Sequence, residues 1–262
     1  MIASAQSIKE EGTEHVARLW EVDPSGKGDS RLVAGSVEGD SDPAFAADGT
    51  LLFLSARENA DGKGVSLWAL SERGAARRIA HHPGGVFAFT SAAHADAVAY
   101  TADLLPGAAD TETYAAARRE REDAMVTAAL YEETATSAWS AALGPDEPHT
   151  FVLRSDRPAV IAGSQGPAGT ADVALSPDGS LVACTRAATG RAPDTNTVVV
   201  ADAATGMHRR TFSRPGHQYY AWRSRPTARP WSASASARRH TTANGTSRSS
   251  RSTWTPAKRP TF

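Results

Sequence analysis

The sequence predicts an all-β fold, a partial β-propeller of three to four blades with one helical insertion and a non-native, disordered tail. The first observation behind this prediction is a repeated unit: a short apolar run, a turn that contains Asp-Gly, and a second apolar run. Residues 43–54 and 173–183 are its clearest copies. Asp-Gly provides the positive φ of a tight hairpin turn, and the flanking runs have the length of β-strands.

The second observation is a Leu-Trp strand that recurs along the chain. Residues 19–22 form one copy, and residues 67–70 form the next copy, 48 positions later. A polar turn that contains glycine follows each copy, and a further short strand follows each turn, at residues 31–33 and 77–80. A period of about 40 to 50 residues with short strands and hairpin turns is typical of a propeller blade.

The remaining elements extend this pattern and interrupt it once. Residues 111–131 are rich in Ala, Arg and Glu, which have high helix propensity, and they predict a helical insertion of about five turns. The start of a fourth blade is expected at residues 217–222. Further strands are expected at residues 85–89, 97–101, 139–153, 197–202 and 207–212.

The composition changes abruptly near the end of the chain. Residues 223–262 contain no Val, Ile, Leu, Met, Asp or Glu, but eight Arg and one Lys. One interpretation is a basic disordered arm that binds nucleic acid or an anionic surface. The other is a segment translated out of frame. With GC-rich codons read from each third base, residues 224–234 can encode SPDGTALVCE, and residues 246–259 can encode VALVAVDVDAGEA. These strings match, in order, the in-frame residues 176–184 and 198–206, so we predict an out-of-frame tail.

The predicted domains are therefore unequal. Residues 1–13 are expected to be a disordered N-terminus, residues 14–222 an incomplete propeller, and residues 223–262 the basic low-complexity tail. The formal net charge of the chain is −1, but the tail holds nine basic and no acidic residues, which leaves the first 222 residues with an excess of ten acids. An acidic body does not suit nucleic acid, so no nucleic-acid partner is expected for it.

Cysteine content and hydropathy exclude other classes of protein. Cys184 is the only cysteine in the sequence, which rules out an intrachain disulfide and a cysteine–metal cluster. Residues 1–12 hold no long apolar run, so the sequence shows no signal peptide and no membrane span. We therefore expect a cytoplasmic protein.

Five short motifs follow one another in a fixed order: residues 41–45, 66–68, 83–86, 143–146 and 176–179, with the charged helix and Trp139 between the third and the fourth. Individually they resemble the repeats of TolB-like (WD40-like) and prolyl-oligopeptidase-like propellers. Their order resembles the N-terminal propeller of S9-type serine peptidases of the prolyl oligopeptidase family, above all the acylaminoacyl-peptidase and dipeptidyl-peptidase relatives. The resemblance spans nearly all of residues 14–222. It departs from the family at residues 137–142, where relatives are richer in Arg, Trp and Asp.

This resemblance implies a C-terminal α/β-hydrolase domain with a Ser-Asp-His triad, and a propeller that restricts entry to short peptides. The implied partners are thus short peptides and the hydrolase domain, with no nucleic acid and no membrane. The serine of such a triad lies in a Gly-x-Ser-x-Gly turn, which the 262 residues do not contain. The nearest match, Gly163-Ser164-Gln165-Gly166, has the wrong spacing, so we predict no catalytic residue.

Two alternatives stay open. The first is a self-contained TolB-like propeller, a binding module with a genuine basic tail. It would need a closed propeller and usually an export signal, and the sequence shows neither. The second is an active peptidase whose hydrolase domain is supplied by a separate chain. Coding sequence for that domain downstream, in another frame and without its own start, would favour a broken gene over a split enzyme.

Several residues are of a type that occurs in functional sites, but the residues around them do not fit such a site. His81-His82 is not followed by Cys, His or Asp at the spacing of metal ligands, and is expected in a polar loop between blades. Asp48 and Asp178 are explained as residues of Asp-Gly turns rather than as cation ligands.

Three further segments are interpreted in the same way. Tyr131-Glu132-Glu133 resembles the paired glutamates with which dipeptidyl peptidases hold a substrate amine, but at a helix end it is expected to be a solvated face. Residues 26–28, Gly-Lys-Gly, lack the frame of a phosphate loop. Trp20 and Trp68 are expected to pack within blades. We therefore predict no catalytic, cofactor-binding or metal-binding residue, and no cofactor.

Overall fold

The computed structural model shows five antiparallel β-sheets and one α-helix in the described part of the chain. The described residues are 1–8, 12, 15–57, 64–71, 75–105, 107–126, 146–154, 157–160, 173–187, 196–214, 219–220, 234–237 and 250–253. Within them, no helix is long and apolar enough to cross a membrane.

Each sheet is built from strands that pair with one another in chain order. Sheet 1 consists of β1 (Ile2–Ile8), β2 (His15–Glu21) and β3 (Arg31–Leu32). Sheet 2 consists of β4 (Ser41–Phe45), β5 (Leu51–Ser55), β6 (Ser66–Leu70) and β7 (Ala76–Ala80). Sheet 3 consists of β8 (Val86–Ser91), β9 (Val98–Leu104), β10 (Glu147–Arg154) and β11 (Arg157–Val160). Sheet 4 consists of β12 (Val173–Leu175), β13 (Leu181–Ala187), β14 (Asn196–Asp202) and β15 (His208–Phe212). Sheet 5 consists of β16 (Tyr219–Tyr220), β17 (Ser234–Ala237) and β18 (Ser250–Thr253).

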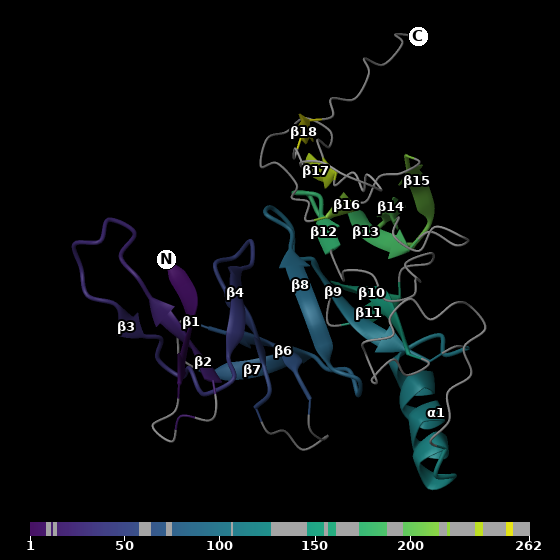
Figure 1. Ribbon diagram of the computed structural model, residues 1–262, viewed down its shortest axis with the longest axis horizontal. Helices are drawn as coiled ribbons and strands as arrows, with labels where there is room; N and C mark the ends of the chain where they lie inside the picture. The colour runs from purple at the N-terminus through teal and green to yellow at the C-terminus, as the bar shows by residue number, and fades with distance from the viewer. Residues whose placement is uncertain are drawn as a thin grey trace, which may run out of the picture.

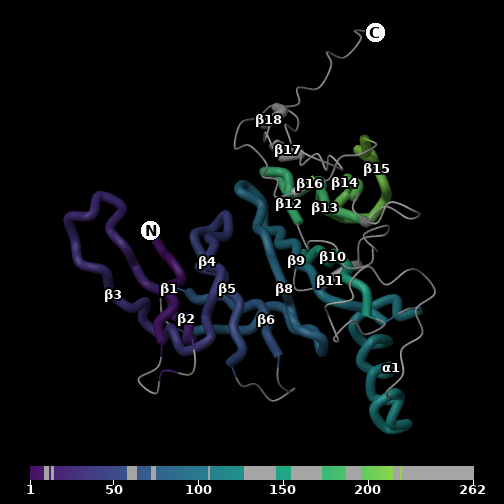
Figure 2. Tube along the Cα trace, viewed as in Figure 1, coloured from purple at the N-terminus to yellow at the C-terminus, as the bar shows by residue number. Residues whose placement is uncertain are grey.

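The sheets follow one another around an arc (Figure 1). The tube trace shows the same progression, from purple in sheet 1 to green in sheet 4 (Figure 2). The first strands of successive sheets are neighbours, because β1 contacts β4, β4 contacts β8, and β8 contacts β12. Four-stranded meanders arranged in this way are the blades of a β-propeller. Sheets 2, 3 and 4 have four strands, sheets 1 and 5 have three, and the ring is not closed, which confirms the predicted partial propeller.

Both predicted Asp-Gly hairpins are confirmed, and each joins the first strand of a sheet to the second. Gly49 and Gly179 have φ angles of 86° and 68°, in the left-handed region that glycine enters without steric cost. The Gly49 amide donates to the Ala46 carbonyl at 3.0 Å, and the Gly179 amide donates to the Ser176 carbonyl at 2.8 Å. The strands expected at residues 85–89, 97–101, 197–202 and 207–212 are also present, as β8, β9, β14 and β15.

Apolar layers lie between successive sheets, and their side chains differ in size. Large side chains such as Tyr100 and Phe151 fill the layer between sheets 2 and 3. The layer between sheets 1 and 2 includes Phe53, which is fully buried. Alanines dominate the layer between sheets 3 and 4. Small side chains let these two sheets approach closely, so that a Cβ built on Gly179 would lie 3.0 Å from the Ala97 Cβ.

The N-terminal segment corrects the expectation of disorder over residues 1–13. Residues 2–8 form β1, which pairs with β2 along its whole length, from Ile2 opposite Glu21 to Ile8 opposite His15. The segment has few aliphatic residues, so its strand depends on backbone hydrogen bonds to β2 and on contacts of Ile2 with the layer between sheets 1 and 2. Pairing with a later strand leaves no local sign in the sequence.

The helical insertion begins where it was expected and ends earlier. Helix α1 spans Thr111–Asp123, instead of the predicted 111–131. Asp110 caps its first turn, because its carboxylate accepts from the Thr113 amide at 2.8 Å. The helix ends at Ala124, after which Met125 adopts a left-handed φ of 50°. Residues 127–131 lie outside the described residues.

The end of the chain is described only in part. β16 opens sheet 5 at the place where the start of a further blade was expected. Within residues 223–262, where no strand was expected, β17 and β18 pair with each other, and β17 pairs with β16. The rest of this segment lies outside the described residues, so its interpretation as an out-of-frame tail stays a prediction. Likewise, of the strand expected over residues 139–153, the structure describes the part from Glu147 onward.

Candidate functional site

The first strands of sheets 1 to 4, β1, β4, β8 and β12, form a curved surface on the inner side of the arc, here called the inner wall (Figure 1). The Ser91 hydroxyl of β8 donates to the Phe45 carbonyl of β4 at 2.8 Å, which ties the ends of these two strands together. Inner strands of propellers surround a central channel. The inner wall is therefore the candidate surface for contact with a ligand.

The inner wall is chemically simple. Its four strands contain no Lys, Arg, His or Cys, and Asp42 is their one charged residue. Two aromatic rings are accessible on it, since Phe45 is 54% exposed and Phe87 is 46% exposed. Phe87 lies at a bulge in the pairing of β8 with β9, between Val86 and Ala88. Such a surface contacts a ligand through rings, hydroxyls and backbone groups, and its four strands hold no histidine of the kind that activates a serine.

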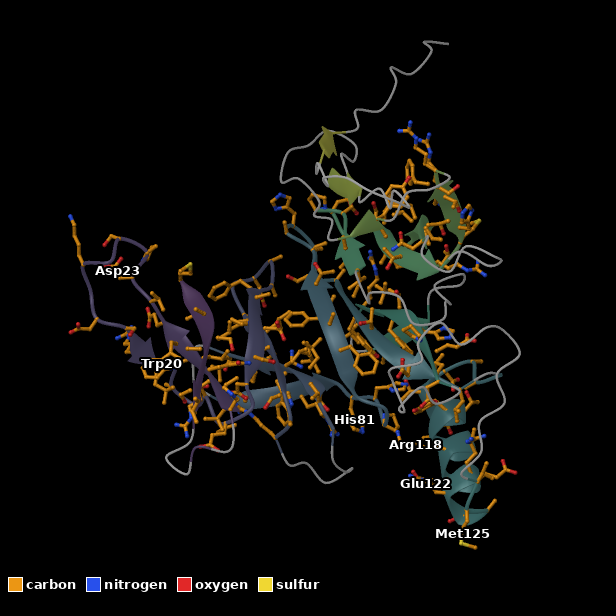
Figure 3. All side chains as sticks on the ribbon, viewed as in Figure 1. Trp20, Asp23, His81, Arg118, Glu122 and Met125 are labelled. Atoms are coloured by element: carbon orange, nitrogen blue, oxygen red, sulfur yellow. The ribbon has the colours of Figure 1, made fainter. Side chains whose placement is uncertain are left out.

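The second polar feature of the fold is the contact between α1 and sheet 3, here called the helix seam. Tyr114 is the buried residue of α1. Arg118 donates to the Pro83 carbonyl and to Glu122 Oε1, both at 3.1 Å, and to the Tyr114 hydroxyl at 3.3 Å. Figure 3 shows Arg118, Glu122 and Met125 along the helix, with Met125 at the end remote from the sheets. Polar bonds from one turn of α1 thus fasten it to the loop between sheets 2 and 3.

His82 lies at the centre of the helix seam and is fully buried. Its ring centroid is 4.7 Å from that of Tyr114 and 5.6 Å from that of Phe151. The Gly84 amide donates to His82 Nδ1 at 3.2 Å, while Nε2 has no hydrogen-bond partner among the described residues. Burial, and then the positive charges of His81, Arg118 and His149, lower the pKa of His82 to about 4. The ring is therefore neutral at pH 7 and acts as a packed, hydrogen-bond-accepting group.

Two carboxyl groups near the helix seam have the opposite shift. Burial, and then the negative charge of Asp146, raise the pKa of Asp103 to about 6. Burial likewise raises the pKa of Asp146, although Arg118 and Arg121 act against that shift. The Tyr114 hydroxyl is close enough to both carboxyl groups for their charges to raise its pKa, after the larger effect of burial. The helix seam is thus a structural contact whose buried groups have perturbed pKa values.

The candidates from the sequence fall into structural roles where they are described. His81 Nδ1 lies 3.0 Å from the Ser66 hydroxyl, and His82 packs in the core rather than in a polar loop. Asp48 accepts from the Thr50 amide at 2.9 Å, as expected for a turn residue. Asp178 accepts from the Ser180 amide at 3.0 Å and from hydroxyl groups in the same turn. Within the described ranges, no three His, Cys, Asp or Glu residues are grouped as metal ligands.

The loop over residues 26–28 encloses a carboxylate. Asp23 accepts from the amides of Ser25 and Gly28, both at 2.9 Å, which places a negative charge where a phosphate loop would hold an anion. Trp68 packs against the layer between sheets 1 and 2, as expected, whereas Trp20 is half-buried in β2. The segments Gly163–Gly166 and Tyr131–Glu133 lie outside the described residues.

Some polar contacts of the fold leave no sign in the sequence. Asp40, which is fully buried, accepts two bonds from Arg57 at 2.6 and 3.1 Å and ties the segment before β4 to the end of β5. Asn196 and Tyr219 form a second contact, between sheet 4 and β16. A single Asp or Asn gives no local signal of a partner 17 or 23 residues away.

Comparisons with known proteins give the fold and no family. No family profile and no curated protein matches the sequence. The acylaminoacyl peptidase of Pyrococcus horikoshii is similar in structure, with a TM-score of 0.54 and 10% identity over 84% of this chain and 31% of that chain. TolB from Acinetobacter baumannii gives a TM-score of 0.43 at 10% identity, over 78% of this chain and 42% of that one.

A third similar structure is the β-propeller domain of the Trilobed protease from Pyrococcus furiosus, with a TM-score of 0.42 and 8% identity over 96% of this chain and 79% of that chain. The chain spans about a third of the length of the acylaminoacyl peptidase. At such low identity the likeness is one of architecture. Together with the arc of four-stranded sheets, it identifies the chain as a β-propeller domain whose ring is not closed.

Proposed function

We propose that this chain is the propeller part of a cytoplasmic serine peptidase of the prolyl oligopeptidase family. In the intact parent it would lie over an α/β-hydrolase domain and limit entry to short peptides. The support comes from two independent sources. The ordered motifs of the sequence resemble that family, and the fold is similar to that of an acylaminoacyl peptidase.

The observation that carries the proposal is the position of the motifs in the fold. Both Asp-Gly hairpins that contribute to the resemblance join an inner-wall strand to its neighbour, β4 to β5 and β12 to β13. The Leu-Trp strand of sheet 2 is β6, the third strand of its sheet. The two Asp-Gly hairpins thus occupy equivalent places in sheets 2 and 4, as repeats of one propeller family do. The other Leu-Trp copy lies in β2, the second strand of sheet 1, so the two Leu-Trp strands are not equivalent.

The chemistry of the inner wall also supports a gating role over a catalytic one. The wall presents Phe45 and Phe87, hydroxyl groups and backbone, and its strands carry no histidine, lysine or cysteine and a single carboxylate, that of Asp42. The sequence contains no Gly-x-Ser-x-Gly. We therefore assign the nucleophile of the parent enzyme to a hydrolase domain outside these 262 residues.

The test compares two products of the gene. One is the 262-residue chain, and the other is the product after a single-base correction that restores the frame beyond residue 222. Each is incubated with a fluorophosphonate probe and with N-acylated and free dipeptide nitroanilides. We expect no labelling of the first product. We expect labelling of the second at a serine in a Gly-x-Ser-x-Gly turn, lost when that serine is replaced by alanine.

Two results would count against the peptidase proposal. If resequencing confirms the present frame and no hydrolase coding sequence follows, the peptidase proposal loses its support, and a binding module with a basic tail becomes the better explanation. If the corrected product is folded but does not react with the fluorophosphonate, the proposal is wrong.

A further inference from the structure

One face of sheet 4 carries an apolar cluster that packs against β16 and not against sheet 3. Its buried members are Ala183, Val198 and Val200, and the partly buried Leu181, Phe212 and Tyr219 pack against them. We call this cluster the outer face of sheet 4. The opposite face of the same sheet packs against sheet 3 through a separate layer. A sheet with an apolar cluster on both faces needs a neighbour on each side.

Two hydrogen bonds between Asn196 and Tyr219, here called the polar clamp, already hold the first strand of such a neighbour against sheet 4. The Asn196 side-chain amide donates to the Tyr219 carbonyl at 2.7 Å, and the Tyr219 amide donates to Asn196 Oδ1 at 2.6 Å. The Asn196 amide thereby imitates the backbone of a paired strand. Asn196 is only 7% exposed, so both of its bonds are shielded from water and hold β16 in one position.

The strands that follow β16 do not suit the outer face of sheet 4. β17 has the sequence SASA, and β18 has the sequence SRST, so neither contains an apolar residue larger than alanine. The second strands of sheets 2, 3 and 4 read LLFLS, VAYTADL and LVACTRA. Burial of aliphatic side chains is the main favourable term in sheet packing, and these two strands have none to contribute.

We propose that the outer face of sheet 4 is the docking face for a further four-stranded blade that starts at β16, and that its next two strands are encoded in the alternative reading frame. With GC-rich codons that frame can read SPDGTALVCE, which matches the Asp-Gly hairpin and β13 of sheet 4. Further on it can read VALVAVDVDAGEA, which matches β14 and the turn after it. In sheet 4 this turn forms around Asp202, which accepts from the amides of Ala204 and Thr205 at 3.1 and 3.0 Å.

This inference does not depend on the peptidase proposal. It rests on an apolar face, a buried clamp and a matching pair of strands, none of which requires catalytic activity. A propeller of any function needs the same blade at this place. The peptidase and docking-face proposals can therefore fail separately.

The experiment measures hydrogen exchange of backbone amides in the encoded chain and in the frame-corrected product. We expect exchange in β14 and β16 to be about tenfold slower, or more, in the corrected product. Peptides from β9 and β10, which lie away from the outer face, should exchange equally in both products and report that sheet 3 is folded. Equal exchange in β14 and β16 of the two products would overturn the proposal.

A pair of substitutions in the corrected product tests the clamp itself. Asn196→Ala removes both bonds to Tyr219 and should restore fast exchange in β16. Thr197→Ala is the matched control, because the neighbouring Thr197 hydroxyl donates within sheet 4, to the Arg186 carbonyl at 3.4 Å. Equal effects of the two substitutions on β16 would show that Asn196 is not the docking residue. Slow exchange without fluorophosphonate labelling would support the blade and reject the peptidase.

Discussion

Gly179 lies at the closest approach of sheets 3 and 4, and its replacement by alanine tests whether this approach is as tight as the structure shows. A Cβ at this position would lie 3.0 Å from the Ala97 Cβ, 3.1 Å from the Ala95 Cβ and 3.4 Å from the Ala92 Cβ. These are alanine Cβ atoms, which cannot rotate away. The backbone must therefore shift, and overpacking of this kind costs about 1–3 kcal/mol.

A second contribution comes from the backbone of Gly179 itself. Its φ of 68° lies in the left-handed region, where a side chain costs about 1–2 kcal/mol. Loss of glycine flexibility in the unfolded chain returns about 0.4–1 kcal/mol. The sum predicts that Gly179→Ala lowers the free energy of unfolding by about 1–5 kcal/mol, with a middle value of about 3 kcal/mol.

Gly49→Ala is the matched control for this substitution. Gly49 occupies the equivalent Asp-Gly turn, with a φ of 86°, but a Cβ there would meet no atom within 4 Å. It should lower the free energy of unfolding by only about 1 kcal/mol, from the backbone contribution alone. Urea denaturation of both variants, followed by circular dichroism, measures the difference. Equal losses in the two variants would refute the close packing of sheets 3 and 4.

Three further predictions concern buried polar groups. Asp40→Ala removes the buried partner of the Arg57 ion pair and should cost about 3–5 kcal/mol in urea denaturation, whereas Glu38→Ala removes an exposed ion pair and should cost no more than about 1 kcal/mol. The His82 pKa of about 4 lies below its usual 6.5, so its contribution to stability is complete above pH 6.5 and is lost as the pH falls toward 4. His82→Phe should therefore flatten the dependence of Tm on pH in this range, and an unchanged slope would contradict the burial of the ring. The Asp103 pKa of about 6 lies above its usual 3.8, so ionisation destabilises the fold as the pH rises through this range. Asp103→Asn should raise Tm at neutral pH and not below pH 4; a rise of equal size at both would point to a cause other than charge.

The repeated elements of the fold could be predicted because their signals are local. Gly49 and Gly179 must adopt positive φ, and the Asp-Gly dipeptide alone indicates a turn of this kind. The start of α1 follows from a helix-favouring composition after Asp110. Its end could not be predicted, because alanines, which favour helix, occur on both sides of the left-handed Met125. β1 was missed because its partner, β2, supplies the pairing that stabilises it.

The polar contacts of the structure could not be predicted from the sequence. The burial of His82 depends on Tyr114 and Phe151, which lie far along the chain, so the histidine pair suggested a polar loop. The exposure of Phe45 on the inner wall depends on how β4 lies against β1 and β8. Such facts follow from the curvature of the whole arc, which no motif encodes.

The order of the sheets has a consequence for how this molecule loses its structure. Each sheet contacts the sheets next to it in the chain through a separate apolar layer, so stability is nearly a sum of nearest-neighbour terms. Unfolding should then begin at the ends of the arc and stop at a junction. Sheets 2 and 3, which share the largest side chains, would persist as a folded pair after both ends have melted. Damage at one end of the chain is in this way confined to that end.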